Sequence, residues 1–315
     1  MAGNHEEALP RRSVLIGLAC GGAAVGAVGL AAIRAILRAR VVAEAIRRAK
    51  ERAGPRIDEA DANSLAQINT SMRLLEGFFD EAKGHAQAFA DDVLGWYSKV
   101  ALIRGQHEAF LAETFREHFF GPDELTQAMT SVVEAYVTEL EAIDNRMLVE
   151  IRMDVADLPV ATSLSSMPEP DLQARYREAC GRIANVTGAD LAVDAGRAVA
   201  DVIVSSVVVM IAARMGTSAA VVGTGAATSW WTFGIGLLVG VIVDQIIATI
   251  WDWTYDPRGQ LATMMEEKID EVRRLVLDGD GGKPGLREEL RRYAHERAKL
   301  RRGAVMTLLA EARSD

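Results

Sequence analysis

The sequence has few cysteines, prolines and aromatic residues. Its 315 residues include two cysteines, eight prolines and 6% aromatic residues, and the basic residues are almost all arginine. Cys20 and Cys180 are isolated, so they form neither a metal-ligand spacing nor a disulfide framework. Segments with the alternating pattern of β-strands are scarce, and the composition therefore predicts an all-α fold.

Motifs for catalysis and cofactor binding are also missing from the sequence. There is no phosphate-binding glycine loop, no dinucleotide fingerprint and no Gly-x-Ser-x-Gly nucleophile motif. The five histidines lack the repeated Glu-x-x-His pairs of a di-iron bundle. Asp278, Asp280 and Glu289 have calcium-loop spacing, but Gly282 and Lys283 stand where a ligand and a glycine are required. We expect a protein that is not an enzyme and holds no metal and no cofactor.

The net charge of −9 is distributed unevenly along the chain. Residues 34–56 carry eight Lys/Arg against two Asp/Glu, whereas residues 57–196 carry ten against 25. A basic stretch beside an apolar segment attracts anionic lipid headgroups. The acidic middle argues against nucleic-acid binding, which needs a basic face. A solvated helical surface or a site for a protein partner would explain this acidic region.

The first apolar segment, residues 14–33, contains 20 uncharged residues. This length spans a bilayer and exceeds the apolar core of a cleaved signal peptide. Three interpretations remain open: an uncleaved anchor, a cleaved twin-arginine signal after Arg11 and Arg12, and a lipoprotein signal at Cys20. We favour the anchor because the segment continues into arginine-rich helical sequence. Residues 1–40 are assigned to this N-terminal transmembrane anchor or signal helix.

Glycines in this first segment have a regular spacing. Gly17 and Gly21 are four residues apart, as are Gly22 and Gly26. Glycine disfavours helix formation, so the regular spacing needs a reason. In membranes that reason is close approach between helices, and we predict a glycine-zipper face that joins copies of the chain.

Residues 41–157 are predicted to form long amphipathic helices outside the membrane. We expect a break at Ala53-Gly54-Pro55, after which apolar residues from Leu65 to Val100 follow a spacing of three and four over five heptads. A short helix over 107–120 follows, and a second long helix begins at Gly121-Pro122. These helices are expected to fold back as a coiled-coil-like hairpin or bundle.

Residues 158–197 are predicted as a proline-rich linker and a helix that continues through Gly181, Gly188 and Gly196. Residues 198–255 are predicted as a transmembrane helical hairpin. Its second arm rises about 30 Å from Trp231 to Trp251, which matches a bilayer core. The aromatic residues that mark the two membrane interfaces are Trp230, Trp231, Trp251, Trp253 and Tyr255.

One carboxylate lies inside this second arm. Gly236, Gly240 and Asp244 recur at a spacing of four residues, which places them on one helix face. Intramembrane carboxylates point to ion pathways by default, yet Asp244 could also clamp a neighbouring helix or Arg214 of the first arm. Both hypotheses remain open.

Residues 256–315 are predicted as a pair of amphipathic helices around a glycine-rich turn, Asp278–Gly285. The last helix places Leu290 and Tyr293 on its apolar side, and its other faces hold arginines that include Arg297 and Arg301. Such a helix lies on anionic lipid or packs on a bundle, and we favour packing.

Together these features predict an all-α integral membrane protein with an N-terminal anchor helix, a coiled-coil-like helical hairpin and a C-terminal transmembrane hairpin. The expected location is a membrane of the bacterial inner-membrane type, with the middle region on the cytoplasmic side; a cleaved signal would reverse that side. The leading hypothesis is a non-catalytic scaffold or assembly component that binds the lipid bilayer and its own copies. An oligomeric pore or ion channel with Asp244 on the pathway and a helical pore-forming toxin are the alternatives.

Overall fold

The computed structural model describes residues 12–95, 107–158, 162–188, 196–214 and 256–311. Within α1 the side chains are described from Ile36 onward. The described residues are predominantly helical, which confirms the all-α prediction. The elements are α1 (Arg12–Gly84), α2 (Ala86–Val93), α4 (His107–His118), α5 (Pro122–Asp154), α6 (Thr162–Ser166), α7 (Glu169–Thr187), α8 (Arg197–Arg214), α10 (Pro257–Asp278), β1 (Gly279–Asp280), β2 (Lys283–Pro284) and α11 (Leu286–Glu311).

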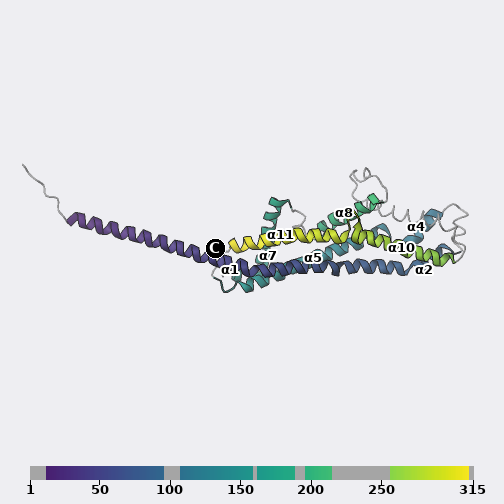
Figure 1. The fold of residues 1–315 in the computed structure, drawn as a ribbon, viewed down its shortest axis with the longest axis horizontal. Helices are drawn as coiled ribbons and strands as arrows, with labels where there is room; N and C mark the ends of the chain where they lie inside the picture. The colour runs from purple at the N-terminus through teal and green to yellow at the C-terminus, as the bar shows by residue number, and fades with distance from the viewer. Residues whose placement is uncertain (1–11, 96–106, 159–161, 189–195, 215–255, 312–315) are drawn as a thin grey trace, which may run out of the picture.

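The helices form an elongated bundle along α1 (Figure 1). Helices α5 and α11 make the most extensive contacts with α1, and α7 packs on α11 while α8 packs on α5. Helices α10 and α11 follow one another along α1 and α2, and both run antiparallel to them: Arg258 lies beside Asp91, whereas Arg302 pairs with Asp58. The fold is therefore a long rod of parallel and antiparallel helices with one continuous apolar core.

The N-terminal part of α1 projects beyond the end of the bundle (Figure 1). Ile36, Leu37 and Val41 on this part are 55%, 54% and 59% exposed, whereas Ala45 is buried. The bundle thus begins at Ala45. From Arg12 to that point the helix rises roughly 50 Å, at about 1.5 Å per residue.

The predicted break at Ala53-Gly54-Pro55 is wrong, because α1 continues through Pro55. A proline inside a helix lacks an N–H donor and costs about 3 kcal/mol. Contacts with the end of α5 hold the helix on both sides of the proline. Arg52 donates to the Asp154 carbonyl oxygen at 2.7 Å, and Arg56 donates to the Asp154 carboxylate at 2.8 Å.

The predicted heptad seam forms the buried face of α1 and α2 from Ile68 to Val93. Its first member, Leu65, is instead 39% exposed, and Ser64 is buried in its place. The reason is that Ser64 contacts Arg301 of α11, a polar contact that the apolar pattern does not include. The final predicted positions, Trp96 and Val100, lie outside the described residues.

The prediction that one helix continues through Gly188 and Gly196 is wrong. Helix α7 ends at Thr187, and Gly188 follows it with a φ of 70°. A glycine takes this left-handed conformation without a Cβ penalty, and it ends helices for this reason. Gly196 also has a positive φ, and α8 begins directly after it.

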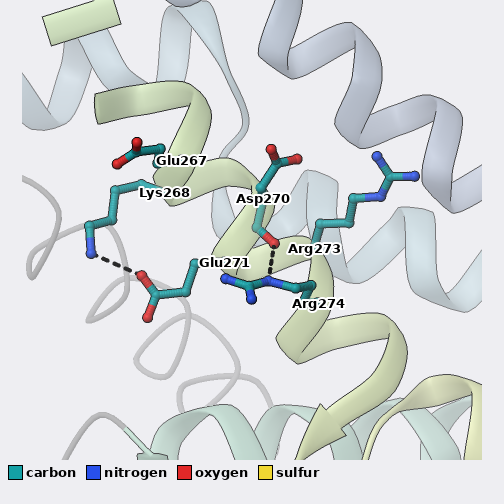
Figure 2. A pocket seen from close by; sticks show the side chains of 6 residues that line it. All are labelled: Glu267, Lys268, Asp270, Glu271, Arg273 and Arg274. Atoms are coloured by element: carbon teal, nitrogen blue, oxygen red, sulfur yellow. Dashed lines mark hydrogen bonds and ion pairs between the residues drawn. The ribbon is translucent and has the colours of Figure 1, made fainter. Parts of the chain in front are cut away.

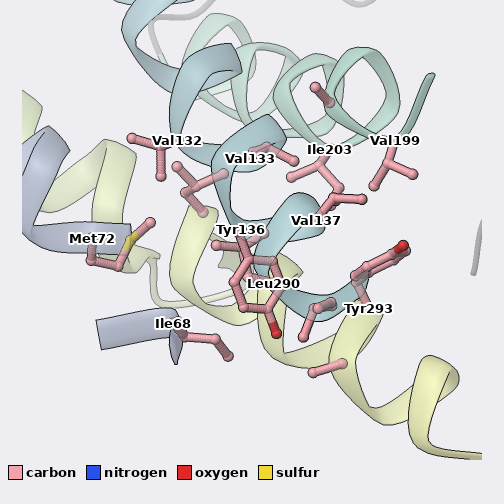
Figure 3. Packing of buried hydrophobic residues seen from close by; sticks show 14 of the residues in the cluster. Ile68, Met72, Val132, Val133, Tyr136, Val137, Val199, Ile203, Leu290 and Tyr293 are labelled. Atoms are coloured by element: carbon pink, nitrogen blue, oxygen red, sulfur yellow. The ribbon is translucent and has the colours of Figure 1, made fainter. Parts of the chain in front are cut away.

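Helix α8, the start of the predicted transmembrane hairpin, packs into the bundle. Val199 and Ile203 lie beside Val133 and Val137 of α5 (Figure 3), and the buried face of α8 continues to Ile211. An apolar helix satisfies a protein core as well as it satisfies a bilayer, because both remove apolar surface from water. Periodicity alone therefore could not distinguish the two environments.

Across the described side chains, no helix combines the length and apolarity needed to cross a membrane. The predicted anchor over 14–33 falls within α1, at positions whose side chains are not described. The second arm of the predicted hairpin lies in 215–255, outside the described residues.

The predicted turn between the last two helices is confirmed as a two-stranded hairpin, β1 and β2. Gly279 opens it with a φ of 85°, and a Cβ at this position would lie 2.3 Å from the Lys283 carbonyl oxygen. The glycine is therefore required by both conformation and space. The final helix, α11, packs on α1 and α7 as favoured from the sequence.

Candidate functional site

Two arginines and one aspartate are buried together inside the bundle. Asp144 comes from α5, while Arg297 and Arg301 come from α11 and share one face because they are four residues apart. The Arg301 side chain is completely buried. Burial of a charge is costly unless it is paired and hydrogen-bonded. The contacts of these three residues therefore decide what the group can do.

Asp144 accepts hydrogen bonds from both arginines. Arg301 Nε lies 2.6 Å from Asp144 Oδ1, and Arg297 Nε and Nη2 lie 3.1 and 3.0 Å from Asp144 Oδ2. Hydrogen bonds between a guanidinium and a carboxylate are among the strongest in proteins. Each oxygen of Asp144 is thus held by a different arginine of α11.

Helix α1 completes the network from the other side. Arg301 Nη1 binds Asp61 Oδ1, and Arg301 Nη2 donates to Ser64 Oγ at 2.9 Å. Ser64 Oγ itself donates to the Ala60 carbonyl oxygen at 2.7 Å, and the Tyr136 hydroxyl donates to the Ser64 carbonyl oxygen at 3.1 Å. One guanidinium therefore joins α1, α5 and α11 at a single point.

The surroundings of Arg297 and Arg301 keep both arginines charged, and two aspartates balance their charge. Burial lowers the pKa of Arg297 and Arg301, but the surrounding groups, of which the Asp144 carboxylate is the largest contributor, together more than offset it, so both pKa values are raised. Two arginines face two aspartates, Asp61 and Asp144, so the network is neutral overall. The network links helices within the bundle and is not arranged to bind an anion, because the guanidinium N–H groups already donate to Asp61, Ser64 and Asp144.

Three tyrosines and one cysteine near the network are held in their neutral forms. Burial raises the pKa of Tyr136, Tyr176 and Tyr293, and it also raises the pKa of the Cys180 thiol. The thiolate is the reactive form of cysteine, so a buried thiol with a raised pKa is a poor nucleophile. The arrangement supplies no activated nucleophile and no exposed general base.

The Tyr176 hydroxyl is buried and makes no hydrogen bond to an oxygen or nitrogen of the described residues. Its polar neighbour is the Cys180 thiol, and sulfur is only a weak hydrogen-bond partner. Tyr176 lies on α7, the helix that packs against α11 over the network. Helix α7 is also joined to α11 by an ion pair between Arg182 and Glu311 at 2.8 Å.

A second charged cluster lies on the surface of α10, around a hollow of about 630 Å³ (Figure 2). Lys268 Nζ lies 2.9 Å from Glu271, and Arg274 donates to the Asp270 carbonyl oxygen at 3.4 Å. Arg273 extends to Asp80 of α1 at 2.8 Å. These pairs join α10 to itself and to α1, so the hollow is a charged surface feature without a reactive group. Its lining residues are Glu267, Lys268, Asp270, Glu271, Arg273 and Arg274.

The site residues predicted from the sequence do not include this network. Gly17, Gly21, Gly22 and Gly26 lie within α1, and Arg214 ends α8. The remaining candidates lie outside the described residues: Gly236, Gly240, Asp244, Trp230, Trp231, Trp251, Trp253 and Tyr255.

The prediction that Arg297 and Arg301 lie on outer faces of the last helix is wrong, since both are buried. A signal for this was present in their position. Tyr293, Arg297, Leu300 and Ala304 recur at spacings of four, three and four, so Arg297 occupies a place in the apolar seam. An arginine in the apolar seam needs an acidic partner on another helix. The sequence alone does not show which of the many acidic residues is that partner.

Within the described residues, no group of three His, Cys, Asp or Glu side chains is placed to hold a metal ion. No family model, curated protein or solved structure matches this chain.

Proposed function

We propose that the protein is a membrane-anchored helical scaffold without catalytic activity. The observation that carries this proposal is the continuity of α1, which is a single helix from Arg12 to Gly84. Its first part contains the uncharged segment 14–33, and its second part is the helix along which the bundle packs. An anchor on this helix would hold the whole bundle without an intervening linker.

The buried network supports a mechanical role. Arg301 binds residues of two other helices, and its partners Asp61 and Ser64 lie on the same α1 helix that carries the predicted anchor. Removing one partner from a buried ion pair is strongly destabilising. Such a group suits a bundle that must keep one helix register.

The exposed stretch of α1 before the bundle supports lipid contact. Arg38 and Arg40 are exposed and form no ion pair with the described side chains, and they alternate with exposed Ile36, Leu37 and Val41. Arginine can place its charge at headgroups while its stem covers apolar surface. This stretch directly follows the predicted anchor, where the headgroup layer would lie.

Self-association is the second part of the proposal. The Gly17/Gly21 and Gly22/Gly26 pairs lie on one continuous helix, whose geometry places residues four apart on a common face. Close helix contact in a bilayer uses such faces. Copies of the scaffold would then meet through their anchors.

Carbonate extraction of membranes from cells that express the full chain tests the anchor. We expect the protein to stay in the membrane pellet, and Val25→Arg to release it, because a central arginine costs a few kcal/mol in a membrane helix. Leu74→Arg is the matched control, since Leu74 is 62% exposed on the bundle. Wild-type protein in the soluble fraction would contradict the proposal.

Planar-bilayer recording separates the scaffold from the pore hypothesis. A scaffold should give no conductance. Currents whose selectivity changes in Asp244→Asn would contradict the scaffold and favour an ion pathway through Asp244.

A further inference from the structure

Residues 36–44 of α1, called the arm below, project from the end of the bundle, and their arginines differ from the next arginines of the same helix (Figure 1). Arg38 and Arg40 are exposed and form no ion pair with the described side chains. Arg47 and Arg48 are also exposed, but both are bound by one carboxylate. Both pairs lie on the surface, so the ion pairs alone distinguish them.

Glu44 holds the second pair of arginines. Its Oε1 lies 2.6 Å from Arg47 Nη2 and 3.0 Å from Arg48 Nε, and its Oε2 accepts from Arg47 Nε at 3.0 Å. The hydrogen bond from Arg47 lowers the pKa of Glu44 to about 2, so the carboxylate stays charged at physiological pH. The unpaired arginine charge of the arm therefore ends at Glu44.

The exposed side chains of the arm surround the helix. Successive residues of an α-helix turn by about 100°, so Arg38 and Arg40 point to different sides, about 200° apart. Ile36, Leu37 and Val41 are each more than half exposed and point in other directions. A helix that lies flat on a membrane keeps its charged and apolar residues on separate faces. The arm instead suits a helix that crosses the lipid–water interface, where the same medium lies on all sides of it.

The position of these arginines along α1 matches the headgroup layer of a bilayer. The uncharged segment 14–33 has the length of a bilayer core. Arg38 and Arg40 lie roughly 8 and 11 Å beyond its end, at about 1.5 Å per residue. The headgroup layer adds about 5–8 Å on each side of the core, and an arginine side chain can reach back toward it. Arg47 lies roughly 21 Å beyond the segment, outside this reach.

The acidic charge of the bundle lies too far away to cancel the arm. Residues 57–196 carry ten Lys/Arg against 25 Asp/Glu. Along α1 this region begins roughly 26 Å after Arg40, at about 1.5 Å per residue. The screening length at physiological ionic strength is about 8 Å. At the end of the bundle that the arm leaves, Asp157 is itself paired with Arg52.

We propose that the arm is a binding site for the headgroups of anionic phospholipids. This inference rests on the proposed membrane anchoring and adds the lipid class to it. Arg38 and Arg40 donate to lipid phosphate oxygens on different sides of the helix, since a guanidinium presents several N–H donors to a phosphate. Their unpaired charge favours an anionic headgroup over a zwitterionic one. The ion pairs of Glu44 confine the site to the arm.

Electron spin resonance of labelled lipids tests this selectivity. The full-length protein is reconstituted into phosphatidylcholine vesicles that contain either spin-labelled phosphatidylglycerol or spin-labelled phosphatidylcholine. The immobilised fraction of each label gives its relative affinity for the protein. We expect phosphatidylglycerol to be favoured about fivefold at low salt, which is the size of the contribution of one arginine near an anionic lipid surface. The preference should fall in 1 M salt, where the screening length is about 3 Å.

Two double variants carry the same change of charge. Arg38→Gln with Arg40→Gln should remove the preference for phosphatidylglycerol, while the protein still floats with the vesicles. Arg47→Gln with Arg48→Gln is the matched control, because it removes two exposed arginines that are already paired, and it should leave the preference unchanged. Circular dichroism checks that both variants remain helical.

Flotation separates failure of the lipid site from failure of the anchor. Protein that floats without a preference for phosphatidylglycerol overturns the site and leaves the scaffold intact. Equal loss of preference in the two double variants also overturns it, because the ion pairs of Glu44 would then not confine the site. If Arg38→Gln with Arg40→Gln changes the oligomeric state and not the lipid preference, the arm binds a second copy and the lipid site is wrong. Protein that fails to float contradicts the anchoring itself.

Discussion

Asp144 and Arg301 are 157 residues apart in the sequence, and their Oδ1 and Nε atoms lie 2.6 Å apart in the interior of the bundle. The second oxygen of Asp144 is held by Arg297, and the remaining donors of Arg301 reach Asp61 and Ser64 of α1. This relationship fixes the axial position of three long helices that apolar stripes alone would allow to slide.

Asp144→Asn should destabilise the bundle strongly. The substitution keeps the shape of the side chain but leaves two buried guanidinium groups facing a single carboxylate, Asp61. Loss of one partner from a buried pair costs about 3–5 kcal/mol. Urea unfolding followed by circular dichroism measures this change in the free energy of unfolding. The matched control is Asp58→Asn, whose exposed pair with Arg302 should contribute less than about 1 kcal/mol.

Two buried tyrosines should respond differently to loss of the hydroxyl at neutral pH. Tyr136→Phe removes the hydrogen bond to the Ser64 carbonyl oxygen and should lower the free energy of unfolding by about 1 kcal/mol. Tyr176→Phe removes a buried hydroxyl that has no oxygen or nitrogen partner among the described residues, so stability should stay the same or rise. Equal losses in both variants would show that the contact of the Tyr176 hydroxyl with the Cys180 thiol stabilises the bundle as much as the Tyr136 hydrogen bond does.

The stability of the bundle should fall at alkaline pH. Burial raises the folded-state pKa of Tyr136, Tyr176 and Tyr293 above the ordinary value of 10.0. The unfolded chain therefore releases these protons first, and the contribution of the neutral hydroxyls is complete below pH 10 and is lost as pH rises above it. Unfolding curves between pH 8 and about 11 measure the slope, since tyrosine titrates near 10. Tyr176→Phe should reduce that slope, and an unchanged slope would contradict burial as its cause.

Two glycines offer opposite outcomes for the same substitution. A Cβ on Gly303 would lie 2.8 Å from Cδ1 of Ile183, the flexible end of a side chain on α7, so Gly303→Ala should be tolerated or stabilising by up to about 1 kcal/mol through helix propensity. Gly279→Ala should be destabilising, because φ is 85° and the new Cβ would meet the Lys283 carbonyl oxygen at 2.3 Å. Thermal unfolding of both variants checks the sign of each change.

Local signals in the sequence predicted a large part of the secondary structure. Pro122 and the acids that follow it mark the start of α5, and the glycine-rich stretch after Asp278 marks the turn before α11. The seam from Ile68 to Val93 was also visible as a heptad pattern. These features depend on residues close together in the chain, so the sequence by itself determined that the fold is all-α and where α4, α5 and α11 begin.

Only the tertiary structure decided which environment each helix occupies. The apolar run of α8 suits a bilayer or a core, and contacts with α5 place it in the core. Pro55 stays inside α1 because both sides of it are held by α5, and Arg301 is buried because Asp144 and Asp61 converge on it from distant positions. Propensity and periodicity report the preferences of a single helix, whereas burial of a charge or a proline depends on partners that folding brings together.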